Sequence, residues 1–218
     1  MPDQLATLRS MLKWADRIEH PTQAPYLLAR AFQEMLSGRR GPVSLEMPWD
    51  QFPAQAEVTP QEPLPLQPVP VPDPEKIAVL ADMIAKAKAP MLWVGSGAQH
   101  ASAEIKALAE KIGAPVLSYR TGRGIVDDRH PLALNVAGGL ELWPKTDLLI
   151  GFGTRLDTPI GRWPTQPPGL KVARVDIDPV EMRRLKVDVG IIADSAEAAA
   201  KLAAVVKQIG RASCRERV

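Results

Sequence analysis

From residue 74 onward, short apolar runs alternate with longer segments whose apolar positions recur at helical spacing. Runs of this kind, bounded by Pro and Gly, are typical of strands covered on both faces. They predict strands at 91–94, 115–118, 147–153, 170–178 and 187–192. The helical spacing predicts helices at 75–88, 101–112, 140–143, 179–185 and 195–208. Strands separated by helices indicate an α/β fold with a doubly wound, mostly parallel sheet.

The pattern before residue 53 is shorter and less regular. Residues 1–17 allow only a short amphipathic helix, with Trp14 in a loop as the alternative. Residues 22–36 form an apolar stripe at helical spacing with Thr22 as its expected N-cap, and 42–48 follow as a strand. One helix and one strand cannot bury their apolar faces alone. We therefore expect 1–52 to be the end of a larger domain, and both ends of the chain to be cut.

Prolines dominate the segment between these two parts. Eight of the 22 prolines lie between Pro53 and Pro74. Proline fixes φ and removes a backbone donor, so the segment favours polyproline II. Residues 53–73 are expected to be a semi-rigid linker, and a ligand for a proline-binding module is the alternative.

Composition narrows the classes further. The 218 residues are 45% hydrophobic, with no apolar run long enough for a membrane span and no signal-peptide pattern, so we expect a cytoplasmic protein. The net charge of +2 comes from three arginines and one glutamate in residues 211–218, which also hold the single Cys214. This excludes a disulfide framework and gives no indication of a nucleic-acid surface. Residues 209–218 resemble a translated sequencing adapter, so we expect an artefact there.

The candidate ligand-binding residues lie just after the predicted strands, because parallel sheets bind ligands at the carboxyl ends of their strands. Gly95 and Gly97 allow a tight turn with exposed N–H groups that suits a pyrophosphate, or a turn with no ligand. Arginine could pair with that group, and aspartate with ribose hydroxyls. The candidates are Gly95, Ser96, Gly97, Arg120, Arg155, Asp176, Asp178 and Asp194.

Each candidate also has a purely structural alternative. Arg155 could pair with Asp157 on the surface, and Asp178 and Asp194 could only cap helices. Tyr119 and Arg120 stand where simple NAD binding needs an acidic residue. The three histidines have no companions at metal-ligand spacing, and no P-loop, Gly-x-Ser-x-Gly or Gly-Asp-Gly…Asn motif is present.

The order of these pieces resembles the thiamine-diphosphate-dependent enzymes of the acetolactate synthase and pyruvate oxidase type. The resemblance rests on segments that extend over nearly the whole chain up to about Lys207: residues 37–48, 91–97, 122–132, 147–155 and 175–194. It implies that 1–52 end the pyrimidine-binding domain and that 74–208 are a central Rossmann-like domain.

The resemblance also implies cofactors and partners. The full-length parent would use thiamine diphosphate and Mg²⁺, which this fragment would not bind because the catalytic Glu and the Mg²⁺-diphosphate motif lie outside it. FAD is the cofactor expected in the central domain of acetolactate synthases. It would lie near Gly95, Ser96, Gly97, Arg155, Asp176, Ile177, Asp178 and Asp194. Residues 156–159, Leu-Asp-Thr-Pro, replace the family's usual Phe-Asp-Asp-Arg, which puts FAD in doubt.

The activity implied is decarboxylation and carboligation of small 2-oxo acids by a homodimer or tetramer, with no nucleic acid or membrane involved. It would belong to branched-chain amino acid biosynthesis, and the fragment itself would be inactive. One alternative is another enzyme of the family: a 2-oxo acid or oxalyl-CoA-type decarboxylase, or a benzaldehyde-lyase-like carboligase. The other is a stand-alone, non-catalytic nucleotide-binding module.

Overall fold

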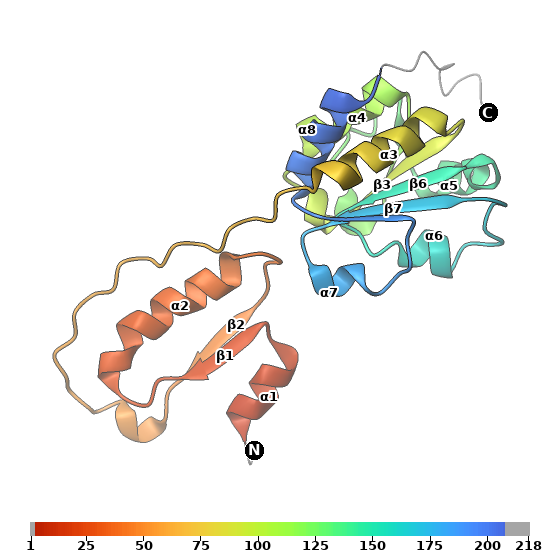
Figure 1. Cartoon of the computed structure of the whole chain (residues 1–218). Helices are drawn as coiled ribbons and strands as arrows, with labels where there is room; N and C mark the ends of the chain where they lie inside the picture. The colour runs from red at the N-terminus through yellow and green to blue at the C-terminus, as the bar shows by residue number, and fades with distance from the viewer. Residues whose placement is uncertain (1–2, 208–218) are drawn as a thin grey trace. The chain divides into compact units, whose positions relative to one another are not determined.

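The computed structural model describes residues 3–207 and divides the chain into two compact units, Met1–Val69 and Pro70–Val218 (Figure 1). The expected adapter tail, 209–218, lies outside the described residues. No helix within 3–207 has the length and apolar character needed to cross a membrane.

The first unit is a small α/β segment with two parallel strands. Its elements in chain order are α1 (Gln4–Met11), β1 (Trp14–Arg17), the 3-10 helix η1 (Pro21–Gln23), α2 (Ala24–Leu36), β2 (Val43–Glu46) and the 3-10 helix η2 (Trp49–Gln51). Strand β1 pairs in register with β2, from Trp14 opposite Val43 to Arg17 opposite Glu46. The expectation of one helix and one strand was therefore wrong. Strand β1 was missed because only Ala15 of its four residues is buried.

The start of α2 also differs from the expected one. His20, not Thr22, caps η1, and its side chain accepts from the N–H of Thr22 while Gln23 reaches back to the N–H of His20. At the other end, Lys13 donates from Nζ to the carbonyl oxygen of Ser37 at 2.6 Å. A cation at this place stabilises the carbonyl groups that end the helix.

The proline-rich segment carries no helix or strand between η2 and residue 74. Its middle follows α2, because Gln33 donates from Nε2 to the carbonyl oxygen of Pro65 at 2.5 Å. The N–H of Gln67 donates to Oγ of the buried Ser37 at 3.0 Å. The part of the segment up to Gln67 is therefore bonded to the first unit.

The second unit is the predicted doubly wound α/β fold. Its elements are α3 (Pro74–Lys86), β3 (Pro90–Val94), η3 (Ser96–Ala98), α4 (Ser102–Ile112), β4 (Val116–Ser118), η4 (Arg120–Gly122), β5 (Ala133–Leu134), α5 (Val136–Leu142), η5 (Trp143–Lys145), β6 (Leu148–Phe152), α6 (Asp157–Gly161), β7 (Lys171–Asp176), α7 (Pro179–Met182), β8 (Val189–Ile192) and α8 (Ser195–Val205). All neighbouring strands are parallel, in the order β5-β4-β3-β6-β7-β8. The prediction of a mostly parallel sheet is confirmed. The two-residue β5 and the one-turn α6 were missed because they are too short to show a period.

Successive residues of the central strands point to opposite layers of core. Helices α3, α4 and α8 cover one face and α6 and α7 the other (Figure 1). On the first face Leu92 and Val94 pack with Ile105 and Leu202; on the second, Met91 and its neighbours pack in an aromatic cluster. In that cluster Trp93 and Trp143 both contact Trp163 edge-on, with ring centroids 5.1 and 5.2 Å away.

Asp188 joins the start of β7 to the chain that enters β8. It accepts from Nζ of Lys171 at 2.8 Å and from the N–H of Val172 at 2.9 Å. Burial opposes its ionisation, but these hydrogen bonds outweigh burial and hold the pKa of Asp188 below the ordinary value of 3.8. A carboxyl group with a lowered pKa in the folded state stabilises the fold above its ordinary pKa, and this stabilisation is lost as the pH falls toward the folded pKa.

We expect Asp188→Asn to lower the free energy of unfolding by less than about 1 kcal/mol near neutral pH, because the ion pair is partly exposed. The difference from the parent chain should shrink steadily below about pH 4 as the unfolded-state carboxyl group protonates. Thermal unfolding of both chains across this pH range measures it. A difference that stays constant on acidification would contradict the assignment.

Candidate functional site

The strand order puts the topological switch point of the sheet between β3 and β6. From β3 the chain goes to β4 on one side, and β6 starts the run β6-β7-β8 on the other. Ligands of open α/β sheets bind at the carboxyl ends of the strands beside such a switch. We name this rim the carboxyl edge. All nine predicted site residues lie on it: Gly95, Ser96 and Gly97 after β3, Arg120 after β4, Arg155 after β6, Asp176, Ile177 and Asp178 at the end of β7, and Asp194 after β8.

At the switch point, the turns after β3 and β6 pack backbone against backbone. The N–H of Gly95 donates to the carbonyl oxygen of Phe152 at 3.0 Å, and that of Gly97 to the carbonyl oxygen of Gly153 at 3.1 Å. A Cβ on Gly97 would lie 2.8 Å from the Cα of Gly153, which itself has φ +55°. The expectation of exposed N–H groups at Gly95 and Gly97 is therefore wrong, because the end of β6 accepts from the first and the turn after β6 accepts from the second.

Arg155 pairs with Glu181 of α7 and not with Asp157. Two parallel hydrogen bonds of 3.1 Å join Nε and Nη2 of Arg155 to the two carboxylate oxygens of Glu181. The Glu181 side chain is only 6% exposed, and Nε of Arg184 lies 2.9 Å from its Oε2. A buried carboxylate is stable in a fold only when it is paired in this way.

Arg174, in the middle of β7, is completely buried. Its guanidinium donates to the carbonyl oxygen of Thr154 at 2.7 Å, to that of Glu181 at 2.7 Å, and to Oδ2 of Asp176 at 2.8 Å. Because these acceptors come from the turn after β6, from α7 and from β7 itself, Arg174 ties three segments together.

Sequence reasoning missed Arg174 and Glu181. One signal for Arg174 was present: it is the only charge inside the apolar run 172–175, and a charge in a doubly covered strand needs a partner. Glu181 gave no such signal, since a glutamate in the first turn of a helix is ordinary.

Two of the predicted aspartates cap helices, which was the structural alternative. Oδ1 of Asp178 accepts from the N–H of Val180 at 2.8 Å. Asp194 accepts from the N–H groups of Ala196 and Glu197, and its Oδ2 lies 2.7 Å from Nε2 of His100. These caps do not test a ligand role, but they commit one oxygen of each carboxylate to the fold.

Three of the predicted site residues make fewer interactions within the protein. Ser96 is exposed, Ile177 is half-buried, and Arg120 is exposed with its guanidinium stacked 5.0 Å from the ring centre of Tyr119. Arg120 has φ +48°. A non-glycine residue in this left-handed region stores strain, which is a frequent property of binding loops.

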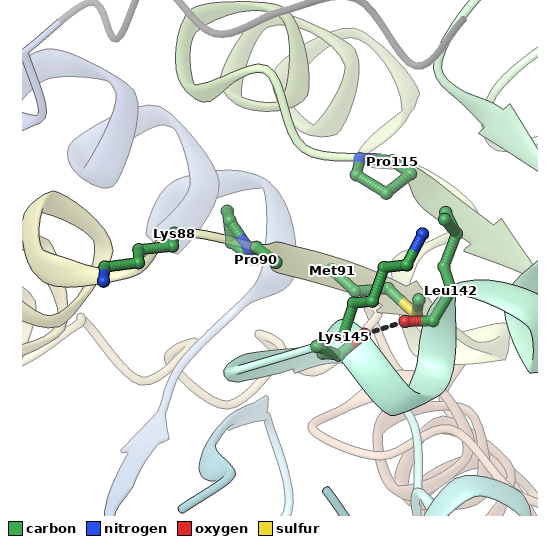
Figure 2. Close-up of a pocket in the computed structure, with 8 residues that line it drawn as sticks. Lys88, Pro90, Met91, Pro115, Leu142 and Lys145 are labelled. Carbon is green, nitrogen blue, oxygen red and sulfur yellow. Dashed lines mark hydrogen bonds between the residues drawn. The ribbon is translucent and has the colours of Figure 1, made fainter. Parts of the chain in front are cut away.

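A hollow of about 230 Å³ lies at the opposite end of the sheet, beside the start of β3 (Figure 2). Pro90, Met91, Pro115 and Leu142 give it an apolar lining, and the chain of Lys145 runs along it. None of the nine predicted site residues contributes to it. Within residues 3–207, moreover, no group of three acidic, His or Cys side chains is placed to hold a metal ion.

Comparison with known proteins agrees with this fold. The family model described as "Thiamine pyrophosphate enzyme, central domain" matches residues 77–202. The acetolactate synthase large subunit of Corynebacterium glutamicum is 33% identical over an alignment of 203 positions that covers 87% of this chain and 32% of that protein. The acetolactate synthase isozyme 1 large subunit of Escherichia coli K12 is 33% identical, over 89% of this chain and 36% of the relative. The chain thus spans about a third of the length of these relatives.

More distant similarity extends to other members. Glyoxylate carboligase of Escherichia coli O157:H7 is 29% identical over 97% of this chain and 38% of its own length. Among solved structures, the thiamine diphosphate-dependent 4-hydroxybenzoylformate decarboxylase of Rhodococcus jostii superposes with a TM-score of 0.77 at 23% identity, over 96% of this chain and 42% of that one. At that identity the likeness shows the fold alone. From the matched family model and the two acetolactate synthases, we conclude that this chain belongs to the thiamine pyrophosphate enzymes and contains their central domain.

Proposed function

We propose that the chain is part of a thiamine-diphosphate-dependent enzyme of the acetolactate synthase type, which decarboxylates one 2-oxo acid and joins the product to a second. The observation that supports this most is the similarity to two acetolactate synthase large subunits at 33% identity over 87% and 89% of the chain. In this proposal residues 1–52 end the pyrimidine-binding domain, 53–73 link, and 74–208 form the central domain of a cytoplasmic homodimer or tetramer.

The second candidate is a relative with a different reaction. The 29% identity with a glyoxylate carboligase, over 97% of this chain, favours this alternative. A stand-alone nucleotide-binding module is less well supported. The sequence similarity to acetolactate synthases extends over both units of the chain, and a module without the family's reaction would not need to keep it.

The cofactors of the reaction do not fit the residues described. Thiamine diphosphate binds through Mg²⁺, which prefers oxygen ligands, and residues 3–207 bring together no group of three His, Cys, Asp or Glu side chains that could hold a metal ion. We therefore assign no chemical step to this chain and expect it to be inactive alone. In the proposed parent enzyme, residues 74–208 contribute a folded central domain, which lies in the sequence between the domains that bind the cofactor.

FAD at the carboxyl edge is also a poor fit. A dinucleotide diphosphate would need donors from the glycine turn and from Arg155. The N–H groups of Gly95 and Gly97 already donate to Phe152 and Gly153, and Arg155 is paired twice with Glu181. Of the nine predicted site residues, Ser96 and Arg120 are exposed and could hold an anion.

The test is to express the complete gene from which the chain comes and to supply pyruvate, thiamine diphosphate and Mg²⁺. We expect acetolactate as the product, no product when thiamine diphosphate is left out, and no turnover by the 218-residue chain. Release of the aldehyde without carboligation would favour the decarboxylase. Turnover by the 218 residues alone would refute the proposal that this chain is inactive without the rest of the enzyme.

A further inference from the structure

Three segments meet at the carboxyl ends of β6 and β7 in one ionic group. We name it the β6–β7 clamp and define it as Arg155, Arg174, Asp176, Glu181 and Arg184. Each of its three arginines lies within hydrogen-bond distance of Asp176 or Glu181, at 2.8 to 3.1 Å. Counted over backbone and side chain together, the two residues at its centre, Arg174 and Glu181, are 0% and 4% exposed.

The clamp is closed in a ring. From β7, Arg174 reaches the carbonyl oxygens of Thr154, in the turn after β6, and of Glu181, in α7. From the turn after β6, Arg155 returns to the Glu181 carboxylate through two hydrogen bonds. Each segment is therefore bonded to the other two, and breaking one link leaves a buried charge or carbonyl group without its partner.

The bidentate geometry matters because a guanidinium recognises carboxylate and phosphate in the same way. Arg155 is one of the two arginines, with Arg120, that the sequence offers as partners of a phosphate. It is 45% exposed, so solvent and small anions can reach it. Glu181 presents to it two oxygens of an anion, as one phosphate group would.

We propose that Glu181 takes the place of a cofactor phosphate as the anion bound by Arg155, so that the central unit reaches its full stability with no dinucleotide at the carboxyl edge. The expected FAD is replaced here by a carboxylate of the chain itself. This inference depends on the geometry of the clamp, and it holds whether the parent is a synthase or a decarboxylase.

The first test is thermal unfolding of the 218-residue chain with and without millimolar FAD or ADP. A ligand that binds only the folded state raises the melting temperature. We expect neither compound to raise it and the purified chain to be colourless. A rise with either compound, or flavin that co-purifies with the chain, would overturn the proposal.

The second test frees Arg155 in the Glu181→Gln variant and uses inorganic phosphate as the probe, against chloride at the same ionic strength. If Glu181 holds the anion position, phosphate should raise the melting temperature of this variant more than that of the parent chain. Arg184→Gln is the matched control: it removes a neighbour of Glu181 but leaves the Arg155 pair, so it should respond to phosphate like the parent chain. An equal rise in melting temperature with phosphate in all three chains would overturn the proposal that Glu181 takes the place of a phosphate.

If Glu181→Gln does not fold, Arg155→Gln decides the question. The clamp predicts a lower melting temperature for this variant in the absence of any ligand, because Glu181 loses its bidentate partner. A melting temperature equal to that of the parent would show that the pair contributes nothing. Neither test involves thiamine-dependent turnover, so their failure is distinguishable from failure of the proposed enzyme activity.

Discussion

Replacing Arg174 by methionine is expected to lower the free energy of unfolding of the central unit by about 3–5 kcal/mol. The side chain is completely buried, and its removal leaves Asp176 and the carbonyl oxygens of Thr154 and Glu181 without their donor. Methionine fills much of the same volume, so the loss comes from unpaired polar groups and not from a cavity. Urea unfolding measures it.

Two further variants separate pairing from packing. Arg184→Met, which changes a 57% exposed arginine of the same clamp, should cost less than about 1 kcal/mol. Adding Asp176→Asn to Arg174→Met should recover part of the stability, because it removes a largely buried carboxylate that has lost its counter-charge. An Arg174→Met variant as stable as the Arg184→Met variant would show that Arg174 does not tie the three segments together.

Alanine at Gly153 is expected to be nearly as damaging, at about 2–5 kcal/mol. Two effects add: φ is +55°, which disfavours any side chain, and the new Cβ would lie 2.4 Å from the carbonyl carbon of Gly97. Since that atom is backbone, relief requires the turns after β3 and β6 to move apart. The melting temperature of the variant is the measurement.

Gly169 provides the matched control. It also has a positive φ, +73°, but a Cβ there would meet nothing within 4 Å. Gly169→Ala should therefore show only the conformational cost, about 1–2 kcal/mol. Equal destabilisation by the two substitutions would mean that the contact between the two glycine turns carries no energy of its own.

The variants of the clamp and of Gly153 test whether the polar groups of the carboxyl edge are bonded to the protein itself. In an open α/β sheet the switch point leaves a crevice in which a ligand can bind. Here the turns at Gly97 and Gly153 are in backbone contact, and the arginines of the β6–β7 clamp are paired with Asp176 and Glu181. The central unit therefore has the strand order of an open α/β sheet, with the N–H groups of Gly95 and Gly97 and the guanidinium of Arg155 bonded within the protein.

Much of the fold followed from local pattern. The strands that became β3, β4, β6, β7 and β8 were predicted within a few residues, because buried parallel strands are continuous apolar runs and the helices between them keep a clear period. Strand β1 was missed because only Ala15 of its four residues is buried, and β5 and α6 were missed because two and five residues are too few for a period to be recognised. The caps formed by Asp178 and Asp194 were among the stated alternatives.

The sequence by itself determined the class of fold, the order of its units and the carboxyl edge as the place where polar residues gather, because these depend on the period of apolar positions and on short motifs in a fixed order. Only the tertiary structure decided what those residues bind. Arg155 and Glu181 are 26 residues apart in the chain, and Gly97 and Gly153 are more than twice as far apart. Whether a guanidinium or an N–H group remains available for a ligand depends on which segments the sheet brings beside it, and no local pattern contains that information.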